Sequence, residues 1–191
     1  MQPSDYKELV DIKKHKRKAI FHSELFFFWN IAKELGVKRI VESGTYHGVT
    51  VNRLEKLFPE CDIWTYEYKD KNFQKAIKKC HPRVNVVFGS MDKSKLNKNT
   101  AVIIDGPKGE KAIELAEEIV GKVALVAIHD MDRYIPVLVE RFVDVVHSGK
   151  PDKAVKKLDK HIPLNSTNKY TKYYGRVLAC IGGGNVIEKI M

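Results

Sequence analysis

Apolar residues in the middle of the chain form short continuous runs, and most of these runs are followed by a segment with helical spacing. Strands buried on both faces show continuous runs, whereas strands with one face in solvent alternate. Repeated strand–helix units of this kind predict an α/β domain with a doubly wound, mostly parallel sheet. The predicted strands are Arg39–Ser43, Asp62–Glu67, Val84–Phe88, Ala101–Asp105 and Val123–Ile128, and the predicted helices are Tyr46–Phe58, Lys71–Cys80, Glu110–Val120 and Arg133–His147.

Two helices are expected before the first strand. One lies around Tyr6–Ile12, and the other runs from Ser23, as its N-cap, to Leu35, with Gly36 as its stop. The second helix is apolar nearly all round, so it must be covered by the core or by a second subunit. A homodimer is one way to cover it.

The pattern breaks after residue 149. We expect a basic, partly helical stretch, then a polar loop, then a last strand, at Lys150–His161, Leu164–Tyr170 and Gly175–Ile181. Nothing marks a second domain. The expected organisation is therefore one domain over residues 1–191, with an N-terminal helical segment (1–36), a cofactor-binding core (37–149) and a basic C-terminal segment (150–191).

Composition narrows the class of protein. The chain has 191 residues, of which 43% are hydrophobic and 30% charged, and no apolar run approaches the ~18 residues of a membrane span. The N-terminus has no apolar signal region, and the three cysteines form no close pair. We expect a reduced, cytoplasmic protein without membrane contact.

The net charge of +10 lies on the two ends of the chain. Residues 41–149 hold sixteen basic and sixteen acidic residues, whereas residues 150–191 hold nine basic and three acidic ones. Basic ends can bind nucleic acid, and Tyr170, Tyr173 and Tyr174 could stack on bases or cover an acceptor. Lysine greatly outnumbers arginine, however, which favours a solvated surface over a phosphate-binding one.

Polar or glycine-rich residues follow each of the five core strands. In an open α/β sheet, ligands bind outside the carboxyl ends of the strands, so these five ends predict one functional rim. The residues concerned are Glu42–Gly48, Glu67, Gly89–Asp92, Asp105–Gly109 and His129–Asp132.

The first turn favours a nucleoside cofactor over a dinucleotide. Gly44 permits a sharp turn, and Gly48 permits close helix packing, but Tyr46 stands where a dinucleotide fingerprint requires its middle glycine. Glu67 follows Gly44 by 23 residues, close to the spacing of ~20 expected for an acid that binds ribose hydroxyls. A plain tight turn and a solvated strand-end charge are the structural alternatives.

The segments RIVESGTYHGVT, YEYKD, VVFGSMD, VIIDGPKG and VAIHD resemble the successive motifs of the class I S-adenosylmethionine-dependent methyltransferases. VESGTYHG and IDGPKG are most similar to those of cation-dependent small-molecule O-methyltransferases. The resemblance covers roughly residues 22–135 and the last strand. It implies a Rossmann-like sheet of seven strands with an antiparallel last strand, although no clear sixth strand is predicted.

The resemblance implies a set of cofactor-binding residues. Glu42 would lie near the methionine end, and Gly44 and Thr45 would line it through their backbone. Glu67 would bind the ribose hydroxyls. Residues implied to complete the site are Ser90 and Met91 beside the adenine, together with Gly48 and Asp105.

The acceptor side is implied by the same resemblance. Asp105 and Asp130 match two ligand positions of a divalent cation, Mg²⁺ or Mn²⁺, and either His129 or Met131 stands where a third ligand, usually Glu or Asn, is found; His129 is the candidate ligand because a thioether binds Mg²⁺ poorly. Lys108, His129 and Asp130 are the candidate catalytic residues. Lys108 could act as a base only with a lowered pKa, and Asp130 could instead cap the next helix.

The leading hypothesis is therefore methyl transfer from S-adenosylmethionine to a hydroxyl of a small molecule or sugar. The alternatives are an RNA methyltransferase, a non-catalytic S-adenosylmethionine-binding module, and a lyase or other reaction on the same cofactor. The sequence has no P-loop and no nucleophile elbow, which argues against an ATPase and a hydrolase of that type.

Overall fold

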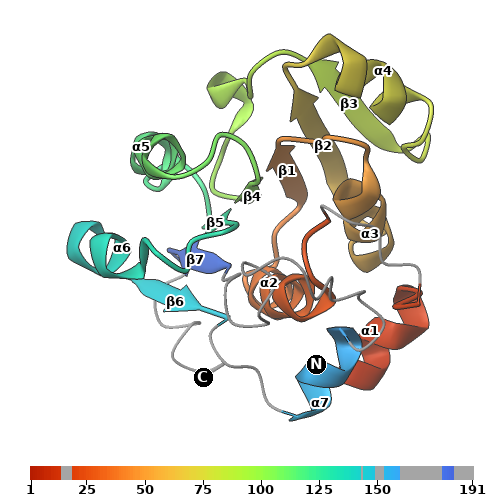
Figure 1. Ribbon diagram of the computed structural model, residues 1–191, viewed down its shortest axis with the longest axis horizontal. Helices are drawn as coiled ribbons and strands as arrows, with labels where there is room; N and C mark the ends of the chain where they lie inside the picture. The colour runs from red at the N-terminus through yellow and green to blue at the C-terminus, as the bar shows by residue number, and fades with distance from the viewer. Residues whose placement is uncertain (14–18, 143, 149–152, 160–177, 183–191) are drawn as a thin grey trace, which may run out of the picture.

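A computed structural model describes residues 1–13, 19–142, 144–148, 153–159 and 178–182 (Figure 1). Its strands form one sheet in the order β3-β2-β1-β4-β5-β7-β6. β1 to β5 are parallel to one another, and β7 is antiparallel to both β5 and β6. The predicted mostly parallel sheet with an antiparallel last strand is confirmed. The strands are β1 Arg39–Ser43, β2 Asp62–Glu67, β3 Val84–Phe88, β4 Thr100–Ile104, β5 Leu125–Ile128, β6 Val145–His147 and β7 Ala179–Ile181.

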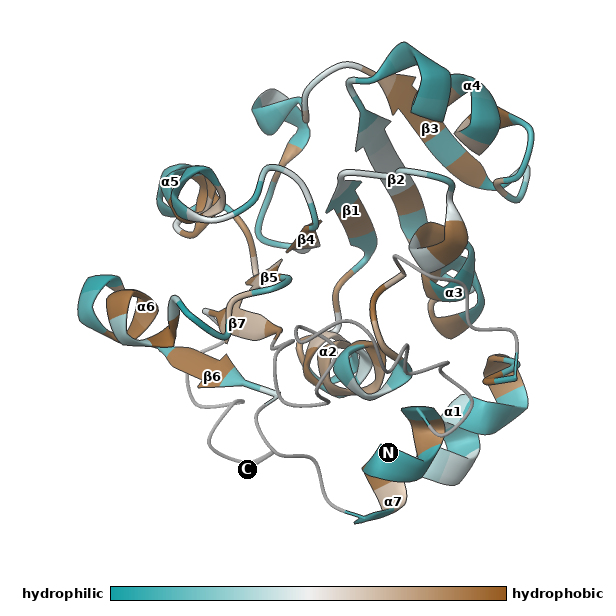
Figure 2. Cartoon of the chain, in the orientation of Figure 1, coloured by the Kyte–Doolittle hydropathy of each residue, from teal (hydrophilic) through white to brown (hydrophobic). Residues whose placement is uncertain are grey.

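Helices cover both faces of this sheet, as Figure 1 shows. Successive residues of one strand enter different cores: Ile40 packs with residues of α1, α2 and α3, whereas its neighbour Val41 packs with residues of α5 and α6. Both faces of the central strands are therefore apolar, which explains their continuous hydrophobic runs (Figure 2). The helices are α1 Pro3–Leu9, α2 His22–Glu34, α3 Val49–Leu57, α4 Asp70–Ile77, α5 Glu110–Ile119, α6 Ile135–Arg141 and α7 Lys153–Lys156, with short 3₁₀ turns at Lys93–Lys95 and Lys157–Asp159.

The sixth strand corrects the sequence prediction. The helix predicted over Arg133–His147 ends at Arg141, and Val145–His147 forms β6 at the sheet edge, paired with β7. Val145 and Val146 are β-branched, and cross-strand pairing with β7 favours their extended form over the helical one. Of the predicted last strand, β7 covers Ala179–Ile181, and residues 175–177 lie outside the described residues. The predicted loop at 164–170 and Tyr170, Tyr173 and Tyr174 also lie outside them.

The Phe-rich helix α2 is covered by its own chain. Ten of its residues are buried, including Leu25, Phe28 and Trp29, so its apolar surface gives no reason to expect a second subunit. The helix begins at His22, one residue before Ser23, which was predicted as its N-cap. Asp159, from the far end of the chain, accepts the backbone N–H groups of His22 (2.8 Å) and Ser23 (3.2 Å). A tertiary carboxylate thus satisfies the helix start, which local sequence cannot reveal.

No helix in the described parts of the chain combines the length and apolar character needed to cross a membrane.

Candidate active site

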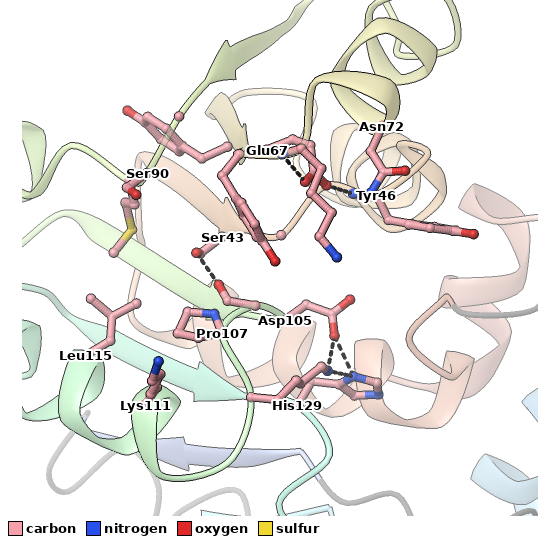
Figure 3. Close-up of a pocket in the computed structure, with 18 of the residues that line it drawn as sticks. Ser43, Tyr46, Glu67, Asn72, Ser90, Asp105, Pro107, Lys111, Leu115 and His129 are labelled. Atoms are coloured by element: carbon pink, nitrogen blue, oxygen red, sulfur yellow. Dashed lines mark hydrogen bonds and ion pairs between the residues drawn. The ribbon is translucent and has the colours of Figure 1, made fainter.

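A cleft of about 990 Å³ opens at the carboxyl ends of the parallel strands. The structure brings the residues that follow all five strands to this one cleft, where Lys111 and Leu115 of α5 close one side (Figure 3). Of the residues expected to bind a cofactor, those that line the cleft are Gly44, Glu67, Ser90, Met91 and Asp105. Glu42, Thr45 and Gly48 do not line it.

Gly44 allows the loops after β1 and β4 to touch. Its φ is +100°, and a Cβ atom there would lie 2.7 Å from the backbone nitrogen of Gly106. The Ser43 carbonyl accepts hydrogen bonds from the N–H groups of Asp105 (2.8 Å) and Gly106 (2.9 Å), which hold the loops in this position. The cleft floor between β1 and β4 is therefore bare backbone, open to a ligand. Gly48 serves packing instead, because a Cβ there would overlap the Cys80 sulfur.

Glu67 is fixed at the end of β2 by two backbone groups. Its Oε2 accepts the N–H of Tyr46 (2.8 Å) and its Oε1 accepts the N–H of Lys69 (2.9 Å). The residue is only 4% exposed, yet it lines the cleft. Each carboxylate oxygen can accept a second hydrogen bond, so the carboxylate is pre-oriented for a pair of neighbouring hydroxyls such as those of a ribose. This geometry fits the nucleoside part of S-adenosylmethionine.

Glu42 lies fully buried next to the cleft floor. Its Oε2 accepts the Thr65 hydroxyl (2.7 Å), and this hydroxyl contacts that of Thr45 (2.5 Å). Burial raises the pKa of Glu42 to about 8, because the low-dielectric interior disfavours the charged form. Glu42 and Thr45 thus support the first turn from behind, and their expected roles near the methionine end of the cofactor stay predictions.

Four charged side chains gather at the ends of β4 and β5. The Lys108 Nζ lies 2.5 Å from Asp105 Oδ1 and 2.9 Å from Asp130 Oδ2, and 3.1 Å from His129 Nδ1. The His129 Nδ1 is also 2.7 Å from Asp105 Oδ1. Asp130 does not cap the next helix, because α6 begins at Ile135 with Tyr134 as its N-cap. This Asp105–Lys108–His129–Asp130 group is hereafter the charged cluster.

The cations of the charged cluster are held in their protonated forms. Burial disfavours the charge on His129, but Glu24 and Asp105 outweigh it and raise its pKa to about 10. Burial likewise opposes the charge on Lys108, and the carboxylates of Asp105 and Asp130 still raise its pKa. The pKa of Asp105 is lowered: burial would raise it, and His129 and Lys108 prevail. Near neutral pH, neither His129 nor Lys108 is therefore a ready proton acceptor.

Glu24 was not identified from the sequence. It belongs to α2 and is 1% exposed. Its Oε2 lies 3.4 Å from His129 Nε2 and accepts a hydrogen bond from the Phe21 backbone N–H (3.0 Å). Three carboxylates therefore lie around the His129 ring: Asp105 at Nδ1, and Glu24 and Asp130 (3.5 Å) at Nε2. The available signal was an acidic residue in the first turn of a mostly apolar helix.

The charged cluster does not fit a divalent cation as it stands. Asp105, His129 and Asp130 place potential ligand atoms within 4.8 Å of one another. The Lys108 ammonium contacts all three residues, and it would be displaced by an ion bound between them.

No protein-family model and no curated protein matches the sequence. Solved structures do resemble it. The plantazolicin methyltransferase BpumL, in complex with a triazolic desmethylPZN analogue and SAH, is 10% identical, with a TM-score of 0.55 and coverage of 93% of this chain and 88% of that chain. A Staphylococcus aureus protein provisionally assigned as a caffeoyl-CoA O-methyltransferase is 14% identical, with a TM-score of 0.54 and coverage of 96% and 93%. The fibrillarin/Nop5p complex is 16% identical, with a TM-score of 0.53 and coverage of 77% and 73%.

These likenesses establish the fold. The chain has the Rossmann-like fold of the methyltransferases it resembles, with the mostly parallel sheet and antiparallel last strand described above. At 10–16% identity the similarity extends to the fold alone.

Proposed function

We propose that this protein transfers a methyl group from S-adenosylmethionine to a hydroxyl oxygen of a small molecule or sugar. The observation that carries the proposal is a cleft with two chemically different halves. One half holds the fixed, acceptor-only carboxylate of Glu67, and the other holds the charged cluster. Similar folds in a methyltransferase bound to SAH and in a provisionally assigned O-methyltransferase support it.

The cofactor half uses backbone and carboxylate groups. Glu67 takes the two ribose hydroxyls, while Ser90 and Met91 lie at the end of β3, beside the position of the adenine. The bare backbone at Gly44 receives the methionine part, and Glu42 lies behind it. The bound cofactor supplies an electrophilic methyl group on a cationic sulfur, and the protein has to align the acceptor oxygen with it.

The acceptor half stabilises a developing negative charge. Lys108 and His129 line the cleft within the charged cluster, and their positive charges would favour the deprotonated form of an acceptor hydroxyl bound beside them. Asp130 is the more exposed carboxylate of the cluster, at 39% for its side chain against 14% for Asp105. We assign Asp130 as the group that receives the hydroxyl proton and Asp105 as the group that positions Lys108 and His129. No step is assigned to a metal ion.

RNA methylation remains the second candidate. The excess of basic over acidic residues in residues 150–191 favours it. A non-catalytic S-adenosylmethionine-binding module would keep the Glu67 half of the cleft and make no use of the charged cluster.

Two measurements separate these candidates. Calorimetry tests whether S-adenosylmethionine binds; Glu67→Ala should weaken binding by about 1–3 kcal/mol, as expected for loss of a charged hydrogen-bond partner. Glu118→Gln is the matched control, since Glu118 lines the same cleft and is paired with Lys93 at its exposed rim. Release of S-adenosylhomocysteine is then followed with phenols, sugars and structured RNA as acceptors.

If the protein binds neither S-adenosylmethionine nor S-adenosylhomocysteine, the proposed function is wrong. Turnover with RNA alone would select the second candidate. Tight cofactor binding with no turnover of any acceptor class would favour the non-catalytic module.

A further inference from the structure

The centre of the charged cluster is filled by a side chain of the protein itself. Lys108 stands on the loop after β4, and its Nζ reaches one oxygen of Asp105 at 2.5 Å and one of Asp130 at 2.9 Å. The same nitrogen lies 3.1 Å from His129 Nδ1. Asp105, Asp130 and His129 are the one group of metal-ligating type that lies close enough together to hold an ion among the described residues.

A divalent ion and this ammonium group would compete for the same space. A Mg²⁺ ion needs oxygen ligands at about 2.0–2.1 Å and a near-octahedral shell of them. An ion between the Asp105 and Asp130 carboxylates would then lie well within van der Waals distance of the Lys108 Nζ, with like charges facing each other. Binding therefore requires Lys108 to leave two carboxylates that it already neutralises.

We infer that the Lys108 ammonium is the resident cation of the charged cluster and replaces a divalent metal ion there. It joins the carboxylates of Asp105 and Asp130 across two neighbouring strand ends, which is the structural task a shared metal ion would perform. The inference concerns cation binding and is independent of methyl transfer, so it stands or falls separately from the proposed function.

The experiment measures Mn²⁺ binding to the ligand-free protein by electron paramagnetic resonance. Lys108→Met keeps a long side chain but removes the charge. Lys111→Met is the matched control, because Lys111 lines the same cleft, whereas Asp105 and Asp130 form their lysine ion pairs with Lys108. Wild type and Lys111→Met should bind Mn²⁺ with a Kd above about 1 mM, a weak-binding limit equal to about −4 kcal/mol.

Removal of the ammonium should expose the two carboxylates to the ion. Lys108→Met is expected to bind Mn²⁺ at least tenfold more tightly than wild type. The double variant Asp105→Asn with Lys108→Met should lose this gain, which would assign the new site to the charged cluster. Circular dichroism establishes that each variant is folded, and Lys108→Ala serves as a second, smaller replacement.

Two results would overturn the inference. One is tight Mn²⁺ binding by wild type that Asp105→Asn abolishes, because the ion would then coexist with Lys108. The other is a folded Lys108→Met or Lys108→Ala protein with unchanged Mn²⁺ affinity. A further measurement needs only the wild-type protein. Micromolar Mn²⁺ should cause no paramagnetic broadening of the His129 ring resonances in its NMR spectrum, and broadening would contradict the assignment of Lys108 as the resident cation.

Discussion

Replacement of Glu42 by glutamine should change how the stability of the protein depends on pH. Glu42 is fully buried, and burial raises its pKa to about 8 in the folded protein, from an ordinary value of 4.5. Its neutral form is favoured by folding. The contribution of Glu42 to stability is therefore complete below pH 4.5 and is lost progressively as the pH rises through 8.

The size of the effect follows from the difference between the two pKa values. Between them, stability falls by about 1.4 kcal/mol per pH unit for this group. Glu42→Gln keeps an oxygen that can accept the Thr65 hydroxyl and removes the titration. The advantage of the variant over wild type should therefore grow by about 2–3 kcal/mol between pH 5 and pH 7.

Urea denaturation at half-unit pH intervals from 5 to 8 measures this difference directly. Titrating groups that do not interact with Glu42 affect both proteins equally and cancel in the difference. Glu34→Gln, on the exposed end of α2, is the control and should run parallel to wild type. A stability difference between Glu42→Gln and wild type that stays constant over this pH range would refute the reasoning.

Three further predictions concern the turn and the charged cluster. Gly44→Ala should lower the free energy of unfolding in urea by about 1–3 kcal/mol, because its Cβ would meet the backbone of Gly106. Gly89→Ala is the control and should lower it less, because nothing lies within 4 Å of a Cβ there. Equal losses in the two variants would contradict the close contact at Gly44. Glu24→Gln should lower the pKa of His129 from about 10, as followed by NMR of the ring, because one of the carboxylates around the ring is lost. An unchanged pKa would exclude the pairing of Glu24 with His129. Asp130→Asn should reduce turnover at least tenfold, which corresponds to about 1.4 kcal/mol in activation free energy, and should leave the affinity for S-adenosylhomocysteine nearly unchanged. Turnover equal to that of wild type would show that Asp130 takes no part in the reaction.

Most of the sheet could be predicted from local sequence. β1 and β2 have the predicted bounds because their central residues are mostly apolar or β-branched and are buried, so burial and propensity agree. β6 could not be predicted in this way. Its three residues continue a helical pattern, and only pairing with β7, more than thirty residues later, makes them a strand.

The candidate site was predictable in position but not in its contacts. Strand ends in a parallel sheet meet at one edge, so Glu67, Asp105 and His129 could be placed together from the alternation alone. The position of the Lys108 ammonium between two carboxylates depends on how two loops fold, and the approach of Glu24 depends on how α2 packs. Sequence spacing holds neither kind of information.

A crystal structure of the protein saturated with S-adenosylhomocysteine tests the central claim most directly. The account predicts a ribose whose two hydroxyls donate to Glu67, an adenine beside Ser90 and Met91, and an amino acid part against the backbone of Gly44. The sulfur atom should face the charged cluster, leaving open space for an acceptor. A ligand bound outside this cleft, or a ribose that makes no contact with Glu67, would contradict it.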